Sequence, residues 1–210
     1  MNKLRPLREA RLYAIVDLNY VPVDRAANVL EKLIRGGVDL VQLRGKERSV
    51  DELTRLAQKL LEVAAAANVP LIINDHAKVA ARVAIQGVHV GQDDDAVAKV
   101  RAAVDRPIIV GKSTHSVTQA IAAQREGADY IGFGPIFATP TKPEYAPIGP
   151  GVIREVHENV SIPIFCIGGI HIDNLQTVID AGAKRVVMVS ALLRARSIVD
   201  YARCAVDMLA

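Results

Sequence analysis

Residues 38–75, "VDLVQLRGKERSVDELTRLAQKLLEVAAAANVPLIIND", contain the pattern that decides the fold. Two short apolar runs, Leu40–Arg44 and Leu71–Asp75, are typical of strands that are buried on both faces of a parallel sheet. The segment between them repeats leucine at the helical period, and Ser49 or Asp51 could cap its start. The stretch therefore predicts a strand, a helix and a second strand parallel to the first.

The same alternation continues along the whole chain. Short apolar runs predict eight strands, at Leu12–Asp17, Leu40–Arg44, Leu71–Asp75, Val88–Gly91, Ile108–Ser113, Tyr130–Ile136, Ile162–Gly168 and Arg185–Ser190. Helix-like segments rich in Ala, Leu, Glu, Lys and Arg separate them. This order predicts an α/β protein with the architecture of a (β/α)8 TIM barrel, as a single domain over residues 1–210. A doubly wound open sheet is the alternative, but no GxGxxG sequence follows the first predicted strand.

The entrances to the predicted strands alternate between two kinds of residue. Glycine precedes the second, fourth, sixth and eighth strands, in "GGVD", "QG", "EGAD" and "AGAK", where it can end the preceding helix. Proline precedes the third, fifth and seventh strands, in "NVP", "DRP" and "SIP", where it blocks further helix. The alternation indicates a weak internal repeat of two strand–helix units, which supports the barrel.

Composition excludes several classes of protein. Half of the 210 residues are apolar, 23% are charged and the net charge is +3, which is typical of a globular chain. Scattered basic residues and an aromatic content of only 4% argue against a nucleic-acid surface. No apolar run approaches the ~20 residues of a membrane span or forms a secretory leader. We expect a cytoplasmic protein that acts on small molecules, without nucleic-acid or membrane partners; association into a homo-oligomer stays open.

The two cysteines are far apart in the sequence and form no CxxC motif. Cys166 lies in an apolar strand pattern and Cys204 in a helical one. We expect both to be buried thiols in a reducing compartment, rather than a disulfide or a metal-binding pair.

Polar residues and glycines collect where the predicted strands end, which is where such barrels carry their chemistry. They are Asp17, Arg44, Lys46, Asn74, Asp75, Gln92, Asp94, Ser113, His115, Thr139, Thr141, Lys142, Gly168, Gly169 and Ser190. Loops are polar in any protein, which explains the polarity but not this assortment of acids, bases, hydroxyls and glycines.

Two of the acids are candidates for a metal site. Asp75 and Asp94 follow neighbouring predicted strands, which would lie ~5 Å apart, so both carboxylates could meet one hard cation. Mg²⁺ typically takes one or two carboxylates together with phosphate oxygens and water. Helix capping is the alternative for each acid, and Asp93 and Asp95 flank Asp94 closely enough to compete with it.

Basic residues at the same rim predict an anion site beside the metal. Arg44, Lys46 and Lys142 follow the second and sixth predicted strands, and their side chains suit phosphate oxygens. A solvated surface is the alternative for each of them alone. Basic groups, two acids and a divalent cation together predict a diphosphate site, in which Mg²⁺ would neutralise charge on a leaving group.

The last two predicted strands offer a second anion site. They end in "CIGGI" and "VSALL", and phosphate in these barrels often binds at the loops after strands seven and eight. Glycine would let backbone N–H groups approach the ligand closely, although a plain tight turn is the alternative. Among the histidines, His89 is interpreted as a packed strand residue, while His115 is a candidate acid–base group.

Several segments, in order, resemble those of the thiamine phosphate synthase family. They are "LYAIVD", "VQLRGK", "LIINDHAKVA", "GVHVGQDD", "GKSTH", "DYIGFGPIFATPTK", "IPIFCIGGI" and "VVMVSAL", and they span residues ~12–192. The resemblance implies a transferase that joins a hydroxymethylpyrimidine diphosphate to a thiazole phosphate, with or without a carboxylate on the thiazole. The products would be thiamine phosphate and diphosphate, formed by Mg²⁺-assisted loss of diphosphate and capture of the pyrimidine-methyl cation by the thiazole nitrogen.

The resemblance also implies roles for individual residues. The pyrimidine diphosphate would be held by Gln42, Arg44, Lys46, Asn74, Ser113 and Lys142, of which Arg44, Lys46, Ser113 and Lys142 would be catalytic. Mg²⁺ would be bound by Asp75 and Asp94. The thiazole phosphate would be held by Thr139, Pro140, Thr141, Gly169, Val189 and Ser190.

Two positions depart from the family pattern. Gly45 stands where the family usually has Glu, and His76 stands where it often has Arg. Two other functions stay open: a thiazole tautomerase on the same barrel, with His115 as its acid–base group, and a non-catalytic module that binds thiazole phosphate.

Overall fold

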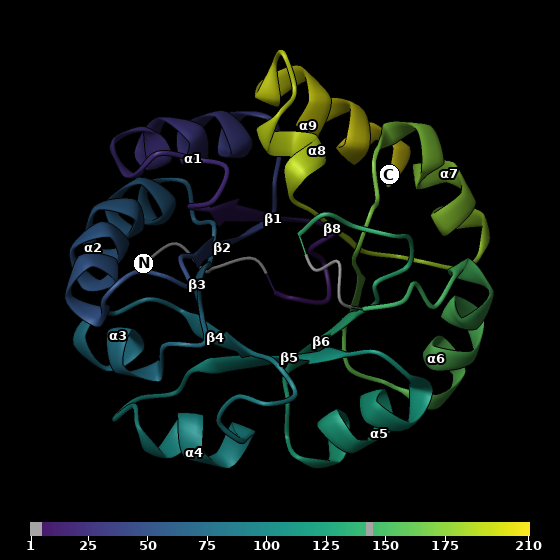
Figure 1. The fold of residues 1–210 in the computed structure, drawn as a ribbon, viewed down its shortest axis with the longest axis horizontal. Coiled ribbons are helices and arrows are strands. Elements are labelled where there is room, and N and C mark those ends of the chain that lie inside the picture. The colour runs from purple at the N-terminus through teal and green to yellow at the C-terminus, as the bar shows by residue number, and fades with distance from the viewer. Residues whose placement is uncertain (1–5, 142–144) are drawn as a thin grey trace.

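The computed structural model describes residues 6–141 and 145–210 and contains a closed barrel of eight parallel strands (Figure 1). The strands follow one another around the ring in chain order: β1 (Leu12–Asp17), β2 (Leu40–Arg44), β3 (Leu71–Asn74), β4 (Gly87–Val90), β5 (Ile109–Thr114), β6 (Tyr130–Phe133), β7 (Ile164–Cys166) and β8 (Val186–Met188). The predicted (β/α)8 fold is therefore confirmed, and the open-sheet alternative is wrong.

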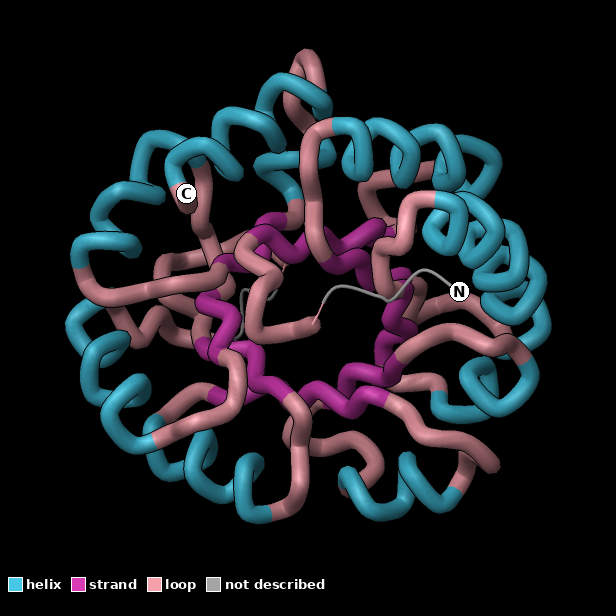
Figure 2. The backbone as a smooth tube through the Cα atoms, turned by 180° about the vertical axis from the view of Figure 1, so that it is seen from behind, coloured by secondary structure: helices cyan, strands magenta, loops and turns pink. Residues whose placement is uncertain are grey.

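Helices form an outer ring around these strands, which is clearest from behind (Figure 2). They are α1 (Ala26–Arg35), α2 (Val50–Ala66), α3 (Ala77–Arg82), α4 (Val97–Ala102), α5 (Val117–Arg125), α6 (Ile153–Asn159), α7 (Ile172–Asp180), α8 (Ser190–Leu193) and α9 (Ile198–Met208), with 3-10 turns η1 (Val23–Arg25) and η2 (Pro150–Val152). Among the residues that the structure describes, no helix combines the length and apolar character needed to cross a bilayer.

Pairing of the first strand with the last closes the ring. Leu12, Tyr13 and Ala14 of β1 lie in register with Val186, Val187 and Met188 of β8. Because every pair in the ring is parallel, all eight carboxyl ends lie at the same end of the barrel. The loops at that end therefore share one mouth.

Aromatic rings fill part of the barrel interior. Tyr13, Tyr130 and Phe165 are fully buried together with Leu40 and Ile72. The ring centroids of Tyr13 and Phe165 lie 5.4 Å apart in an edge-to-face arrangement, which is a favoured geometry for aromatic pairs. The inside of the barrel is thus a packed floor beneath the mouth.

Helix α2 begins as the sequence predicts, with Ser49 rather than Asp51 as its cap. The Ser49 hydroxyl accepts a hydrogen bond from the Glu52 N–H at 3.2 Å, and the Glu52 carboxylate accepts one from the Ser49 N–H at 3.0 Å. The hydrogen bonds that the Glu52 carboxylate accepts from the Ser49 N–H and the Ser49 hydroxyl lower its pKa. The reciprocal pair satisfies two N–H groups that the helix itself leaves without partners.

The sixth strand is shorter than predicted. The apolar run predicts Tyr130–Ile136, but β6 ends at Phe133 because Pro135 has no N–H with which to continue the ladder. Beyond it, the Ile136 and Phe137 N–H groups donate to Ile167 O and Gly168 O at 2.8 and 3.0 Å. The chain after β6 is therefore held against the end of β7, beside the mouth.

The prediction for Cys204 is wrong, whereas that for Cys166 is confirmed. Cys166 is buried in β7, and burial raises the pKa of its thiol to about 12. Cys204 is exposed on α9. The buried face of α9 is formed by Ala202 and Ala205, and position 204 falls off that face at the helical period.

Gly87 does not end a helix, in contrast to the expectation from the strand entrances. Gly37, Gly127 and Gly182 do have positive φ angles after their helices, but Gly87 lies inside β4 with no positive φ. A Cβ at Gly87 would lie 2.5 Å from Ile72 Cδ1 and 2.8 Å from the Ile109 carbonyl oxygen. Glycine is required here for the close approach of neighbouring strands.

We predict that Gly87→Ala lowers the free energy of unfolding by about 1–3 kcal/mol, the usual cost of overpacking a core. Gly151→Ala is the control, because a Cβ there would have no atom within 4 Å. Urea denaturation of both variants checks this. Equal stability of the two variants would show that the barrel relaxes freely around Gly87.

Candidate active site at the mouth of the barrel

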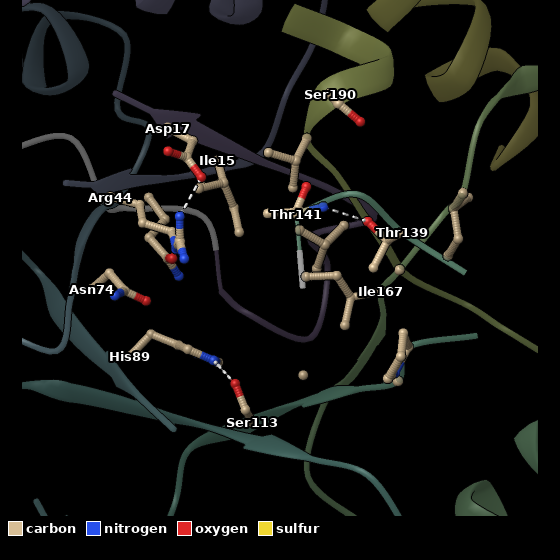
Figure 3. A pocket seen from close by; sticks show the side chains of 18 of the residues that line it. Ile15, Asp17, Arg44, Asn74, His89, Ser113, Thr139, Thr141, Ile167 and Ser190 are labelled. Atoms are coloured by element: carbon tan, nitrogen blue, oxygen red, sulfur yellow. Dashed lines mark hydrogen bonds and ion pairs between the residues drawn. The ribbon is translucent and has the colours of Figure 1, made fainter. Parts of the chain in front are cut away.

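A pocket of about 810 Å³, counted to its open mouth, lies at the carboxyl ends of the strands (Figure 3). Its lining includes these predicted site residues: Gln42, Arg44, Asn74, Ser113, Thr139, Thr141, Val189 and Ser190. Apolar side chains of Ile15, Ile167, Ile170 and Val187 complete the walls. This lining suits small polar substrates that carry an apolar ring.

Arg44 is held in place by a buried carboxylate. Asp17 and Arg44 lie in register at the ends of β1 and β2, and Arg44 Nη1 lies 2.5 Å from Asp17 Oδ2. Asp17 is 1% exposed, and its other oxygen accepts a hydrogen bond from the Asn19 N–H at 2.9 Å. Asp17 thereby holds the planar, charged guanidinium group of Arg44 against the pocket, as Figure 3 shows.

Asp75 and Asp94 form a carboxylate pair beside Asn74. Asn74 Nδ2 donates to Asp75 Oδ2 at 2.5 Å, and the Gly91 N–H donates to Asp94 Oδ2 at 2.6 Å. Asp75 has a φ angle of 62°, in the left-handed region that few residues other than glycine adopt. Neither acid lines the pocket itself; they lie at its edge, next to Asn74.

The electrostatics of this carboxylate pair suit a cation. Burial raises the pKa of Asp75 to about 6, and the hydrogen-bonded Asp94 adds to the rise, while Lys46 and Arg44 oppose it. Lys46 is exposed at the rim. Among the described residues no group of three or more His, Cys, Asp or Glu side chains is arranged to hold a metal. Two carboxylates alone match Mg²⁺ that takes its remaining oxygens from substrate and water.

The loop after β6 forms the opposite wall. Thr139 and Thr141 line the pocket, and Pro140 between them is exposed. The Thr141 N–H donates to Thr139 Oγ1 at 3.3 Å, and Thr141 Oγ1 lies 3.2 Å from the Tyr20 hydroxyl. The predicted catalytic residue Lys142 lies outside the described residues.

Two glycines bring the backbone after β7 close to this loop. Gly168 and Gly169 have φ angles of 101° and 63°. A Cβ at Gly169 would lie 2.6 Å from the Ala138 carbonyl oxygen, so no larger side chain fits there without displacing the loop. Val189 and Ser190 line the same corner, where α8 begins. Gly168 lines this corner as well, whereas the predicted site residue Gly169 does not line the pocket.

The two histidines of interest have different surroundings. His89 is 8% exposed in β4 and hydrogen-bonds Tyr130 and Ser113, so its interpretation as a packed strand residue is confirmed, although it also lines the pocket floor. His115 lines the pocket with its Nδ1 2.5 Å from the Gly134 carbonyl oxygen. Its ring stacks on Tyr145 with centroids 4.4 Å apart.

Sequence reasoning missed the parts that Asp17 and Tyr20 take in the site. Asp17 is predicted at the rim without a role, although an acid ending a strand next to an arginine-ending strand is a usable signal of an ion pair. Tyr20 reaches Thr141 from the loop after β1, and Arg194 lies over its ring at 4.9 Å. Nothing in the sequence around Tyr20 signals that contact.

Comparison with known proteins identifies the family. Residues 12–192 match the family model described as thiamine monophosphate synthase. The chain is 42% identical over 193 residues to the thiamine-phosphate synthase of Shouchella clausii, covering 91% of this chain and 92% of that one. It is 36% identical over 199 residues to the thiamine-phosphate synthase of Methanospirillum hungatei, covering 94% and 97%.

Solved structures give the same result. The thiamine phosphate pyrophosphorylase of Pyrococcus furiosus superposes with a TM-score of 0.88 at 26% identity, covering 97% of this chain and 96% of that one. A geranylgeranylglyceryl phosphate synthase from Thermoplasma acidophilum, with a TM-score of 0.70 at 15% identity, shares the fold alone. Because the family model spans most of the chain and the relatives cover nearly all of it, this protein belongs to the thiamine monophosphate synthase family.

Proposed function

We propose that this protein is a thiamine-phosphate synthase, which joins a hydroxymethylpyrimidine diphosphate to a thiazole phosphate and releases diphosphate. The observation that carries the proposal is that Arg44 and Ser190 line one pocket at two different corners, each of which would suit an anion. One corner has Arg44 beside the Asp75–Asp94 pair, and the other has the glycine turn beside Ser190. A reaction between a diphosphate and a monophosphate needs both.

The diphosphate side would be bound by Arg44, with Lys46 and Lys142 as further cations. Arg44 needs no rearrangement to act, because Asp17 already fixes its guanidinium against the pocket. Preorganised charge of this kind favours the departing diphosphate more than the intact substrate, since negative charge grows on the leaving oxygen as its bond breaks. Arg44 and Lys46 are therefore assigned to leaving-group stabilisation.

Asp75 and Asp94 would hold Mg²⁺, and Asn74 would keep Asp75 in place through its 2.5 Å hydrogen bond. The pKa of Asp75 is raised by burial and, to a smaller extent, by Asp94, and this supports the assignment, because a buried carboxylate beside a second one favours either a proton or a cation. When bound, Mg²⁺ would neutralise charge on the diphosphate oxygens.

The thiazole phosphate would bind between Thr139, Thr141 and the corner of Gly169, Val189 and Ser190. Gly168 lines this corner of the pocket, and both threonines offer hydroxyl donors. The hydrogen bond between the Tyr20 and Thr141 hydroxyls ties the loop after β6 to the loop after β1. These contacts would place the thiazole nitrogen toward the pyrimidine.

The reaction itself needs no base in this scheme. The bond from the pyrimidine methylene carbon to oxygen breaks, and diphosphate leaves with the electron pair. The lone pair of the thiazole nitrogen then forms the new carbon–nitrogen bond. Ile15, Ile167 and Val187 form part of the pocket wall and would exclude water. Water would otherwise capture the pyrimidine-methyl cation that is left when diphosphate departs.

The tautomerase alternative gains no specific support. It would require His115, which lines the pocket, as an acid–base group. It would also leave Arg44 and the carboxylate pair without a task, and the two relatives from Shouchella clausii and Methanospirillum hungatei are synthases by name.

The direct test is an assay for thiamine phosphate from the two purified substrates, with and without Mg²⁺. We expect product and stoichiometric diphosphate only when both substrates and Mg²⁺ are present. Absence of product under those conditions would overturn the proposed function, and full activity in excess chelator would overturn the part assigned to Mg²⁺.

We predict that Asp75→Asn lowers kcat/KM by roughly 100-fold or more, about 3 kcal/mol in the barrier, which is typical for the loss of one charge-stabilising group. Asparagine tolerates the left-handed backbone at this position, so the fold should survive. Asp93→Asn, at an exposed acid next to Asp94, is the control. Near-normal turnover in Asp75→Asn would contradict the metal assignment.

We predict that Thr141→Ala raises the KM for thiazole phosphate about tenfold, the effect of roughly one hydrogen bond, and changes the KM for pyrimidine diphosphate less than about twofold. Steady-state kinetics with each substrate varied in turn measures both. Thr118→Ala, at an exposed position of α5, is the matched control. A rise in both KM values would mean that Thr141 does not separate the two anion sites.

A further inference from the structure

A continuous chain of hydrogen bonds crosses the barrel beneath the pocket. Gln42 Nε2 donates to the Tyr13 hydroxyl at 2.6 Å, and the Tyr13 and Tyr130 hydroxyls lie 3.0 Å apart. The Tyr130 hydroxyl lies 3.1 Å from Nδ1 of His89, and Nε2 of His89 lies 2.9 Å from the Ser113 hydroxyl oxygen. Both ends of the chain, Gln42 and Ser113, line the pocket.

Tyr13 and Tyr130, in the middle of this chain of hydrogen bonds, are shielded from water. Tyr130 is 0% exposed, Tyr13 and Gln42 are 1% exposed, and His89 is 8% exposed. Burial raises the pKa of both Tyr13 and Tyr130 well above the ordinary phenol value, so both hydroxyls keep their protons. In such a setting each buried donor needs an acceptor among its neighbours.

Gly111 of β5 leaves the space that the Tyr130 ring occupies. A Cβ at Gly111 would lie 2.1 Å from Cζ of Tyr130 and 2.5 Å from its hydroxyl oxygen. The Tyr130 ring could not lie where it does if position 111 carried any side chain. The arrangement is thus specified by the sequence of the strands as well as by the polar groups themselves.

Each hydroxyl has only one proton to donate, so all the hydrogen bonds in this chain run in the same direction. An amide nitrogen only donates, so Tyr13 accepts from Gln42 and must give its single proton to Tyr130. Tyr130 then gives its own proton to Nδ1 of His89. A neutral His89 with Nδ1 as acceptor carries its proton on Nε2 and donates it to Ser113.

We propose that His89, Tyr130 and Tyr13 are positioning residues that fix which way the Ser113 hydroxyl points, so that Ser113 presents a donor to the substrate. Because its oxygen already accepts from His89, the Ser113 proton is directed at an acceptor in the pocket, such as a ring nitrogen of the pyrimidine. At the other end, Gln42 presents its second N–H and its carbonyl oxygen. This assignment rests on the proposed function for the identity of the substrate only.

The two ends of the chain are coupled. Reversing the Gln42 amide would make its oxygen the acceptor for Tyr13, and every hydroxyl along the chain would then have to turn. The His89 proton would move to Nδ1, and Ser113 would become an acceptor for the substrate. A heteroaromatic ring is therefore recognised by one fixed pattern of donors and acceptors, and the two contacts cannot change independently.

The tautomer of His89 is the direct readout. In protein labelled with 15N-histidine, the imidazole nitrogen shifts should report a neutral ring protonated on Nε2. In Tyr130→Phe, the His89 nitrogen shifts should move toward the values of a mixture of the two neutral tautomers. Tyr13→Phe should do the same, although the Tyr13 hydroxyl is bonded to Tyr130 rather than to His89. A wild-type ring protonated on Nδ1 would overturn the proposed direction.

Kinetics give a second, independent readout. Tyr13→Phe should raise the KM for pyrimidine diphosphate about tenfold, with kcat and the KM for thiazole phosphate changed less than about twofold. Tyr201→Phe is the matched control: it removes a hydroxyl that accepts from the Ile172 N–H at 3.0 Å, outside the chain. It should leave both the His89 signal and the KM for pyrimidine diphosphate unchanged.

The outcomes separate this inference from the proposed function. If the wild-type protein formed no thiamine phosphate, the proposed function would be wrong. The His89 nitrogen shifts would still show in which direction the hydrogen bonds run. An unchanged tautomer and an unchanged KM in Tyr13→Phe would overturn the positioning role. Thermal unfolding checks the fold of each variant, and the wild-type tautomer decides the direction even if Tyr130→Phe does not fold.

Discussion

Closure of eight parallel strands into one ring is the constraint on which the rest of this structure depends. The register of β1 with β8 brings both ends of the strand order together and leaves every carboxyl end at one mouth. Residues as distant in sequence as Asp17, Arg44 and Ser190 consequently line one pocket. Without closure, the loops after β2 and after β8 would lie far apart in a sheet and could not line one pocket.

Two features at that mouth work against the stability of the fold. The Asp17–Arg44 pair is nearly buried, so removing one partner would leave an uncompensated charge, at a typical cost of about 3–5 kcal/mol. Asp75 holds a left-handed backbone angle that usually costs on the order of 1–3 kcal/mol. A fold that served stability alone would need neither feature. Both are expected where charge must be held ready for a reaction.

The fold was predictable because buried parallel strands leave uninterrupted apolar runs, and the runs at β1 and β2 matched the structure to the residue. The end of β6 was not predicted, because the role of Pro135 depends on a neighbouring strand. Cys204 was misplaced because a helical pattern alone does not say how wide the buried face is. The rim residues were predictable as a group, but the Tyr13–Tyr130–His89 contacts were not, because they join three strands whose spacing only the barrel sets.

We propose that Arg44 and the Asp75–Asp94 pair form a diphosphate site that requires a divalent cation. Calorimetric titration of inorganic diphosphate into the protein, once with Mg²⁺ and once with excess chelator, measures this without any turnover. Binding at least about tenfold tighter with Mg²⁺, a coupling of about 1.4 kcal/mol, is the predicted result. Equal affinity under the two conditions would contradict it.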